Sequence, residues 1–308
     1  MPRLLRRTHW LRHIAHLDPA TDYEEIYRVT VTHEFPWDMN QALSFALFRT
    51  YAVPSIGRLL DATGEFARDT QKRYDDTALL LDQVSIHGLH SDSGRRAIRR
   101  VNQMHGAYDI SNDDMRYVLA TFVVVPRRWI DDYGWRPFTS AEVAASTRYY
   151  AELGRLLGIK EIPTTYEAFE RLLEDYEAAY FRYDPASRRV ADATMALMRT
   201  FYPRAVARPV DVFSRALMDE PLLEAFGYRA PPAAVTRASR AALRLRGRAE
   251  RLLPARRTGK HVEDLRWVRS YPDGYDVEEL GTFPRGCPVP HGRATCTAAQ
   301  APATRAAS

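Results

Sequence analysis

The stretch RRVNQMHGAYDISNDDMRYVLATFV (residues 99–123) reads as two helices that meet at a short turn. Up to the turn, apolar residues recur at the three- and four-residue spacing that is typical of a buried helix face: Ala97, Val101, Met104 and Tyr108. His105 lies within this apolar face, whereas Arg100 is expected to face away from it. Ser111, followed three residues later by Asp114, predicts the start of the second helix.

The same signals recur along most of the chain. Further helix starts are predicted by a threonine with a glutamate three residues later, at Thr21/Glu24, Thr139/Glu142 and Thr164/Glu167. Prolines are expected to separate the helices at positions 36, 54, 126, 137, 163 and 203. The one β-branched run, FVVVP, is too isolated to build a sheet. These patterns predict an all-α fold made of one multi-helix domain.

Composition shifts divide the chain into four expected parts. Residues 1–17 form a basic amphipathic segment, and residues 18–230 form the helical domain. Residues 231–268 are expected to contain a basic accessory helix. Residues 269–308 are rich in proline and glycine and are expected to be largely disordered.

Composition also narrows the function classes. The net charge of +5 is carried almost wholly by arginine, since lysine occurs only at positions 72, 160 and 260. No nucleic-acid-binding motif accompanies this charge, so a nucleic-acid partner is not expected. The two cysteines, Cys287 and Cys296, form no disulfide framework, which favours a reducing, cytoplasmic setting. The basic segments 1–17 and 236–260 are candidates for peripheral membrane contact, although a solvated helix face is the simpler interpretation.

Three groups of residues are candidates for chemistry. His105 places an imidazole on a buried helix face, as a haem iron requires of its ligand, yet spacing alone favours a hydrogen-bonded core histidine. Arg73 and Thr77, in KRYDDTALLL, lie one helical turn apart and share a face. His87 and His90 lie beside a Gly/Ser-rich loop and are expected at the surface rather than at a metal. Phosphate-loop, G-x-S-x-G, H-E-x-x-H and CxxC motifs are absent from the sequence.

Several stretches between about residues 18 and 230 resemble one family. They include DPATDYEEIYRVTVTHEFPWDMN, KRYDDTALLL, AIRRVNQMHGAYDISNDDMRYVLATFVVVPRRW and LGRLLGIKEIPTTYEAFERLLEDYE. Together they resemble the haem-binding oxygenase family of latex-clearing proteins (rubber oxygenases), and more closely its MpaB branch. The resemblance implies a globin-like helical core around haem b, with additional helices. It also implies cleavage of a carbon–carbon double bond in an isoprenoid chain by O₂, giving two carbonyl products.

The resemblance assigns roles to individual residues. The histidine of VNQMHG matches the family's axial ligand, which makes His105 the proximal candidate, and the R-x-x-x-T motif places Arg73 and Thr77 near the distal side and a propionate. Two departures stand out. Asp76 replaces the lysine that precedes the motif threonine in rubber oxygenases, and Leu119 stands where many bacterial relatives have a histidine.

The resemblance also implies an upstream glutamate that acts as a base, and Glu65 and Asp61 are the two candidates for it here. The resulting expectation is a haem b-dependent oxygenase that acts with O₂ on an apolar isoprenoid, terpenoid or lipid-like substrate. Two alternatives remain: a non-catalytic haem-binding or haem-sensing protein, and a helical scaffold in which His105 is a core residue.

Overall fold

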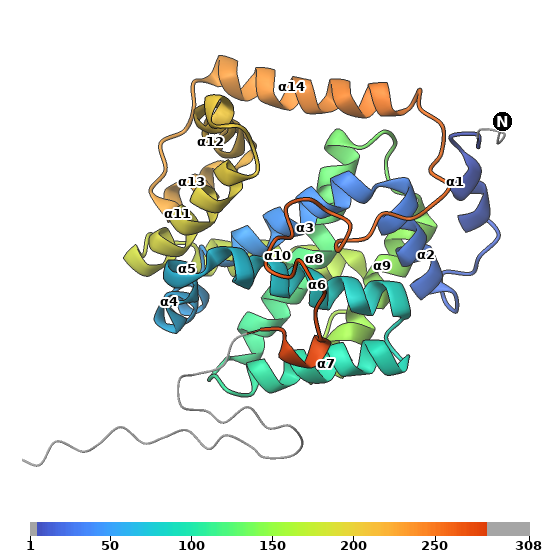
Figure 1. Cartoon of the computed structure of the whole chain (residues 1–308), viewed down its shortest axis with the longest axis horizontal. Helices are drawn as coiled ribbons and strands as arrows, with labels where there is room; N and C mark the ends of the chain where they lie inside the picture. Colours follow the sequence, from blue (N-terminus) through green and yellow to red (C-terminus); the bar gives the residue numbers. More distant parts are fainter. Residues whose placement is uncertain (1–4, 282–308) are drawn as a thin grey trace, which may run out of the picture.

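The computed structural model describes residues 5–281 of the chain. Within this range the chain forms fourteen α-helices with short connections (Figure 1). No strand occurs in this part, where the only extended pairing is an isolated bridge between Leu5 and Ala255. The predicted all-α class is therefore confirmed.

The helices follow one another along the chain in this order: α1 (His9–Ile14), α2 (Tyr23–Val29), the π-helical turn η1 (Thr30–Glu34), α3 (Pro36–Thr50), α4 (Pro54–Thr63), α5 (Glu65–Arg68), α6 (Thr70–His87), α7 (Asp92–His105), α8 (Asn112–Tyr133), α9 (Ser140–Leu156), α10 (Tyr166–Tyr180), α11 (Pro185–Thr200), η2 (Arg204–Val206), α12 (Ala207–Leu217), α13 (Glu220–Phe226), α14 (Ala233–Glu250) and η3 (Val277–Glu279).

Helix α8 lies at the centre of the fold and packs against α3, α9, α10 and α14. It begins as predicted, because the Ser111 hydroxyl accepts a hydrogen bond of 3.0 Å from the backbone N–H of Asp114. Side chains around nearly its whole circumference are buried from Tyr117 to Tyr133. A helix that is apolar all round is typical of a position inside a protein core.

The run FVVVP belongs to this central helix, and the prediction that Pro126 separates two helices is wrong. A proline inside a helix removes one backbone hydrogen bond and costs about 3 kcal/mol in an exposed helix. Here the neighbouring residues Val124 and Val125 are buried against other helices. Burial of these side chains offsets the local cost, and α8 continues through the proline.

The other predicted helix starts have mixed outcomes. Thr139 and Glu142 form the predicted capping box at the start of α9. Helix α2 instead follows Asp22, with no side-chain cap, and α10 is capped by Thr165, one residue after the predicted position. Adjacent threonines and aspartates offer alternative caps, and sequence alone does not rank them.

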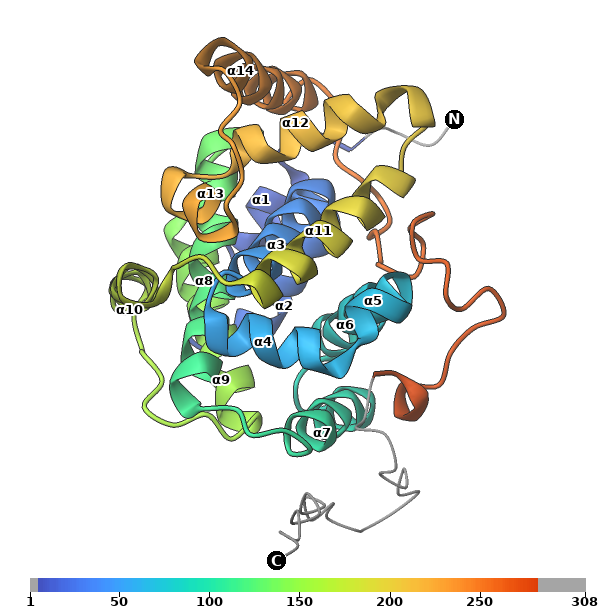
Figure 2. The same cartoon turned by 90° about the vertical axis from the view of Figure 1, so that its left-hand side faces the viewer.

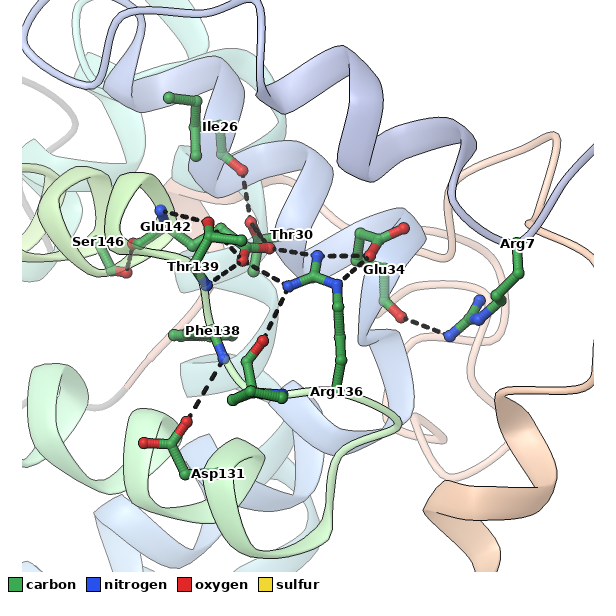
Figure 3. Close-up of polar contacts among 11 residues, drawn as sticks. Arg7, Ile26, Thr30, Glu34, Asp131, Arg136, Phe138, Thr139, Glu142 and Ser146 are labelled. Carbon is green, nitrogen blue, oxygen red and sulfur yellow. Dashed lines mark hydrogen bonds and ion pairs between the residues drawn. The ribbon is translucent and has the colours of Figure 1, made fainter.

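A buried ion cluster joins the loop after α8 to η1 and α9 (Figure 3). Arg136 donates hydrogen bonds to Glu34 at 2.6 Å and to Glu142 at 2.7 Å, and both carboxylates are essentially inaccessible to solvent. Glu142 also accepts from the backbone N–H of Thr139 at 2.8 Å. Arg7 donates to the backbone carbonyl of Glu34 at 3.3 Å, which ties the N-terminal segment to the same cluster.

Residues 251–281, which we call the C-terminal strap, cross over α3 and α6 and end beside α7 (Figures 1 and 2). Carboxylates on α6 hold the strap: Asp82 accepts from the backbone N–H of Val262 at 2.8 Å, and Asp75 accepts from that of Ser270 at 3.0 Å. Leu280 is fully buried. The disorder expected for residues 269–308 therefore does not extend to residues 269–281, while Cys287 and Cys296 lie outside the described residues.

The basic helix expected within residues 231–268 is α14, which lies along one edge of the molecule (Figure 1). It meets the core at Gly247, where a β-carbon would lie 2.3 Å from the backbone carbonyl oxygen of Tyr133. Only glycine permits so close an approach between α14 and the end of α8. The basic helix is thereby packed directly against the central helix.

Candidate functional site

His105 is the last residue of α7, which packs along α6. Its helix is placed partly by Arg100, which is 5% exposed and donates a hydrogen bond of 2.6 Å from Nε to the carbonyl oxygen of Leu280. The prediction that Arg100 faces solvent is therefore wrong. The C-terminal strap covers this side of α7. The sequence of α7 alone does not indicate that a distant segment packs there.

The His105 imidazole is held in its neutral form. Burial, together with the nearby positive charge of Arg73, lowers the pKa of His105 to about 4. Its Nδ1 is buried and has no hydrogen-bond partner among the described residues. His33 offers a contrast: burial also lowers its pKa to about 4, but its Nδ1 is paired with the Thr32 hydroxyl at 2.7 Å.

This contrast bears on the core-histidine alternative. Buried polar groups in proteins are nearly always hydrogen-bonded, and an exception calls for an explanation such as an unplaced ligand. His33 satisfies this rule within the described residues, whereas the Nδ1 atoms of His105 and His261 do not. Of these two, His105 is the one that lies near Arg73. A neutral imidazole with a free ring nitrogen is also the form that binds a metal.

Arg73 and Thr77 interact with each other on α6, as their spacing predicted. The Arg73 guanidinium donates to the Thr77 hydroxyl, which in turn donates to the Arg73 carbonyl oxygen at 3.1 Å. Arg73 forms no ion pair with any residue in the described range 5–281. The structure thus places near His105 a positive charge that has no ion-pair partner among residues 5–281.

Asp76 and Leu119, the two departures noted with the resemblance, both contact other parts of the protein. Asp76 is buried and accepts hydrogen bonds from Lys72, at 2.7 Å, and from the Tyr271 hydroxyl of the C-terminal strap. Leu119 is buried in α8 and packs on α9, where it lies against Gly154. Asp76 therefore holds the strap in place.

The two candidates for an upstream base differ in position. Asp61 pairs with Arg189 at 2.6 Å on the surface. Glu65 pairs with Arg68. The pKa of Tyr108 is raised, first by burial and also by the charge of Glu65, while the charge of Arg73 lowers it. Glu65 and Arg73 therefore both act on Tyr108. Glu65 is thus the candidate nearer to the Arg73 side of α6.

The two surface histidines lie away from these residues. His87 and His90 are exposed, as expected, and His90 pairs with Glu152 at 3.1 Å. No group of three or more histidine, cysteine, aspartate or glutamate side chains in residues 5–281 is arranged to hold a metal ion.

Sequence reasoning missed a large cavity on a neighbouring face of α6. Its volume is about 970 Å³, and its α6 wall is formed by Tyr74, Ala78, Leu81, Asp82 and Ser85. These residues are rotated about 100° around the helix from Arg73 and Thr77, which do not line it. The walls come from helices far apart in the chain, so no local pattern could reveal the cavity.

The pH dependence of stability provides a test of the neutral state of His105. The folded pKa lies below the unfolded value of about 6.5, so the unfolded chain binds a proton first as the pH falls. We expect the unfolding free energy of the wild type to fall by about 2 kcal/mol relative to His105→Leu between pH 7.5 and pH 5. Urea unfolding of both apoproteins at each pH measures this difference. A difference that does not change with pH would contradict the assignment.

Comparison with known proteins gives one consistent result. Residues 39–248 match the family model described as the ER-bound oxygenase mpaB/B′/rubber oxygenase catalytic domain. The ER-bound oxygenase mpaB of Penicillium roqueforti is 32% identical over 229 residues, which cover 68% of this chain and 76% of the relative. The ER-bound oxygenase mpaB′ of Penicillium brevicompactum is 32% identical over 217 residues, covering 64% and 51%. The chain thus spans about half the length of the latter relative.

A structural comparison matches a solved structure of latex clearing protein LCP in the closed state. The TM-score is 0.54, with 14% sequence identity, and the match covers 79% of this chain and 72% of the other. At this identity the likeness concerns the fold alone.

Proposed function

The chain belongs to the family of mpaB-type ER-bound oxygenases and rubber oxygenases, and on this basis we propose that it is a haem b-dependent oxygenase. The proposed reaction is cleavage of a carbon–carbon double bond in an apolar isoprenoid, terpenoid or lipid-like substrate by O₂. One double bond and one O₂ molecule give two carbonyl groups, so the reaction balances without a further reductant.

The observation that carries this proposal is the half-buried His105, whose pKa is lowered to about 4 and whose Nδ1 is buried without a partner among the described residues. The residues around it suit haem b: one imidazole nitrogen is available for the iron, and the unpaired charge of Arg73 suits a propionate carboxylate or a polar oxygen. When bound, haem b would supply the redox-active iron that activates O₂.

The protein's own residues would have defined tasks. His105 would hold the cofactor from the proximal side and stay unprotonated at neutral pH, because its pKa is about 4. Thr77 accepts a hydrogen bond from Arg73, which limits the positions that the guanidinium can take.

The position of Asp76 supports a second candidate function, haem binding or haem sensing without turnover. A buried aspartate that is hydrogen-bonded to Lys72 and Tyr271 stands where rubber oxygenases have a lysine. The resemblance implies that Asp76 would lie on the distal side of a bound haem, where it would leave no lysine to act as a ligand, and this difference favours haem binding without turnover.

Turnover separates the two candidates. Reduced, haem-loaded protein is mixed with squalene under ¹⁸O₂, and carbonyl products are reduced at once with borohydride to prevent exchange with water. We expect two alcohol products, each with one ¹⁸O atom, and none under nitrogen. Haem-loaded protein that gives no cleaved squalene, and none from a panel of other isoprenoids, would support the non-catalytic function.

We also propose peripheral contact with an anionic membrane through α14 and the residues after it. Leu245, Leu252 and Leu253 are 65%, 86% and 57% exposed, and the surrounding residues 236–260 include eight arginines. Exposed leucines among basic residues suit the interface of an anionic membrane. Within residues 5–281, no helix is long and apolar enough to cross a membrane.

A further inference from the structure

The cavity beside α6 has a strongly apolar interior. Helices α3, α6 and α12 supply Leu43, Leu47, Leu81 and Phe213, and the aromatic rings of Trp129 and Trp267 close it from α8 and the C-terminal strap. Its volume of about 970 Å³ lies at the upper end of the range of about 300–1,000 Å³ that is typical of small-molecule sites. A space of this size and character suits a long hydrocarbon chain.

The opening of the cavity carries positive charge. Arg256, Lys260 and Arg266 of the C-terminal strap line it, and the last two are exposed to solvent. None of the three forms an ion pair with a residue in the described part of the chain, and Arg256 Nε is buried without a hydrogen-bond partner there. Of the two other arginines that line the cavity, Arg246 binds Asp38 and Glu250, whereas Arg269 donates to the backbone carbonyl of Thr200 and forms no ion pair within residues 5–281.

Three acidic residues lie near these cations: Asp82, and Glu263 and Asp264 of the C-terminal strap, whose charges contribute to the raised pKa of Asp82. Asp82 is the one acidic residue among the described residues that line the cavity, and it accepts a hydrogen bond from the backbone N–H of Val262. Burial raises the pKa of Asp82 to about 7, so its negative charge is incomplete at neutral pH. The cavity therefore combines an apolar interior with a net positive opening.

We propose that this cavity binds a single-chain amphiphile, with its hydrocarbon chain between α3 and α6 and a carboxylate or phosphate head group at Arg256, Lys260 and Arg266. Apolar walls favour the chain through burial of its surface, and unpaired cations favour the anionic head. This site goes beyond the proposed function, because Arg73, Thr77 and His105 do not line the cavity.

Binding to the full-length apoprotein tests this site without haem or turnover. Trp37, Trp129 and Trp267 line the cavity, so a ligand should change the tryptophan fluorescence. We titrate oleate, oleoyl lysophosphatidate and oleyl alcohol below their aggregation concentrations. Saturable binding of one oleate per chain is expected, with oleyl alcohol at least tenfold weaker; the lysophosphatidate shows whether a phosphate head is preferred to a carboxylate.

Two variants separate the head-group and chain contributions. The double reversal Lys260→Glu/Arg266→Glu should weaken oleate about tenfold and leave oleyl alcohol unchanged. The matched control is Arg248→Glu/Arg251→Glu, which makes the same charge change at exposed residues that do not line the cavity. Ala78→Phe should weaken both ligands by filling the cavity, and circular dichroism checks that this variant folds.

Three outcomes would overturn the proposal. Equal affinity for oleate and oleyl alcohol would remove the head-group site, and unsaturable binding would indicate partition rather than a cavity. Displacement of oleate by one equivalent of haem would make the cavity the haem site itself. His105→Ala is expected to bind oleate as the wild type does. Loss of haem binding tests His105, and loss of oleate binding tests the cavity, so the two assignments can fail independently.

Discussion

His105→Ala is expected to abolish the Soret absorption band of protein that has been incubated with haem b and desalted. The substitution removes a neutral imidazole near Arg73 whose Nδ1 is buried and lacks a partner among the described residues. Iron coordination to histidine is a large part of haem retention when a single protein ligand is available. Absorption spectra with and without dithionite measure the loss, which needs no assay of activity.

A matched control and a rescue make this result specific. His90→Ala removes an exposed histidine, paired with Glu152, and should leave the Soret band unchanged. His105→Gly should regain the band when imidazole is added, because the small molecule can occupy the space of the missing ring. Since His105 ends its helix, glycine there costs less than in a helix interior. Full haem retention in His105→Ala would rule out this residue as the ligand.

Local patterns predicted those features whose causes lie within a few residues of each other. The helix–turn–helix around His105, the Ser111 cap and the Arg73–Thr77 contact are all of this kind. The resemblance to a known family then changed the interpretation of His105 from a core residue to a ligand. The unpaired Nδ1 gives that interpretation a structural argument that spacing alone did not supply.

Features that depend on distant residues could not be predicted in this way. Arg100 was expected at the surface, but its partner, the Leu280 carbonyl, lies 180 residues away. The cavity needs walls from α3, α6, α12 and the C-terminal strap, and none of these segments shows a cavity by itself. The role of Asp76 in holding the strap likewise depends on Tyr271, 195 residues later.

Arg136→Met is expected to destabilise the fold strongly, because Arg136 belongs to the buried ion cluster that joins the loop after α8 to η1 and α9. It leaves Glu34 and Glu142, which are 0% and 1% exposed, without their shared counter-charge. Removing one partner from a buried ion cluster typically costs about 3–5 kcal/mol. Urea unfolding at pH 8 measures this loss. The matched control, Arg128→Met, removes an exposed arginine that pairs with Glu170 and Glu174, and should cost at most about 1 kcal/mol.

The pH dependence of this loss distinguishes buried charge from lost packing. Burial raises the pKa of Glu34, and Arg136 opposes that rise in the wild type. Without Arg136, the pKa of Glu34 in the folded protein should rise further above its value in the unfolded chain. The variant is therefore destabilised at high pH, where Glu34 is charged, and this destabilisation is lost as the pH falls and the carboxylate is protonated. The gap between wild type and Arg136→Met should therefore narrow between pH 8 and pH 5. A gap that stays constant would mean that Arg136 stabilises the fold by packing over Phe35 and Trp135, whose rings lie 4.8 and 5.1 Å from its guanidinium carbon.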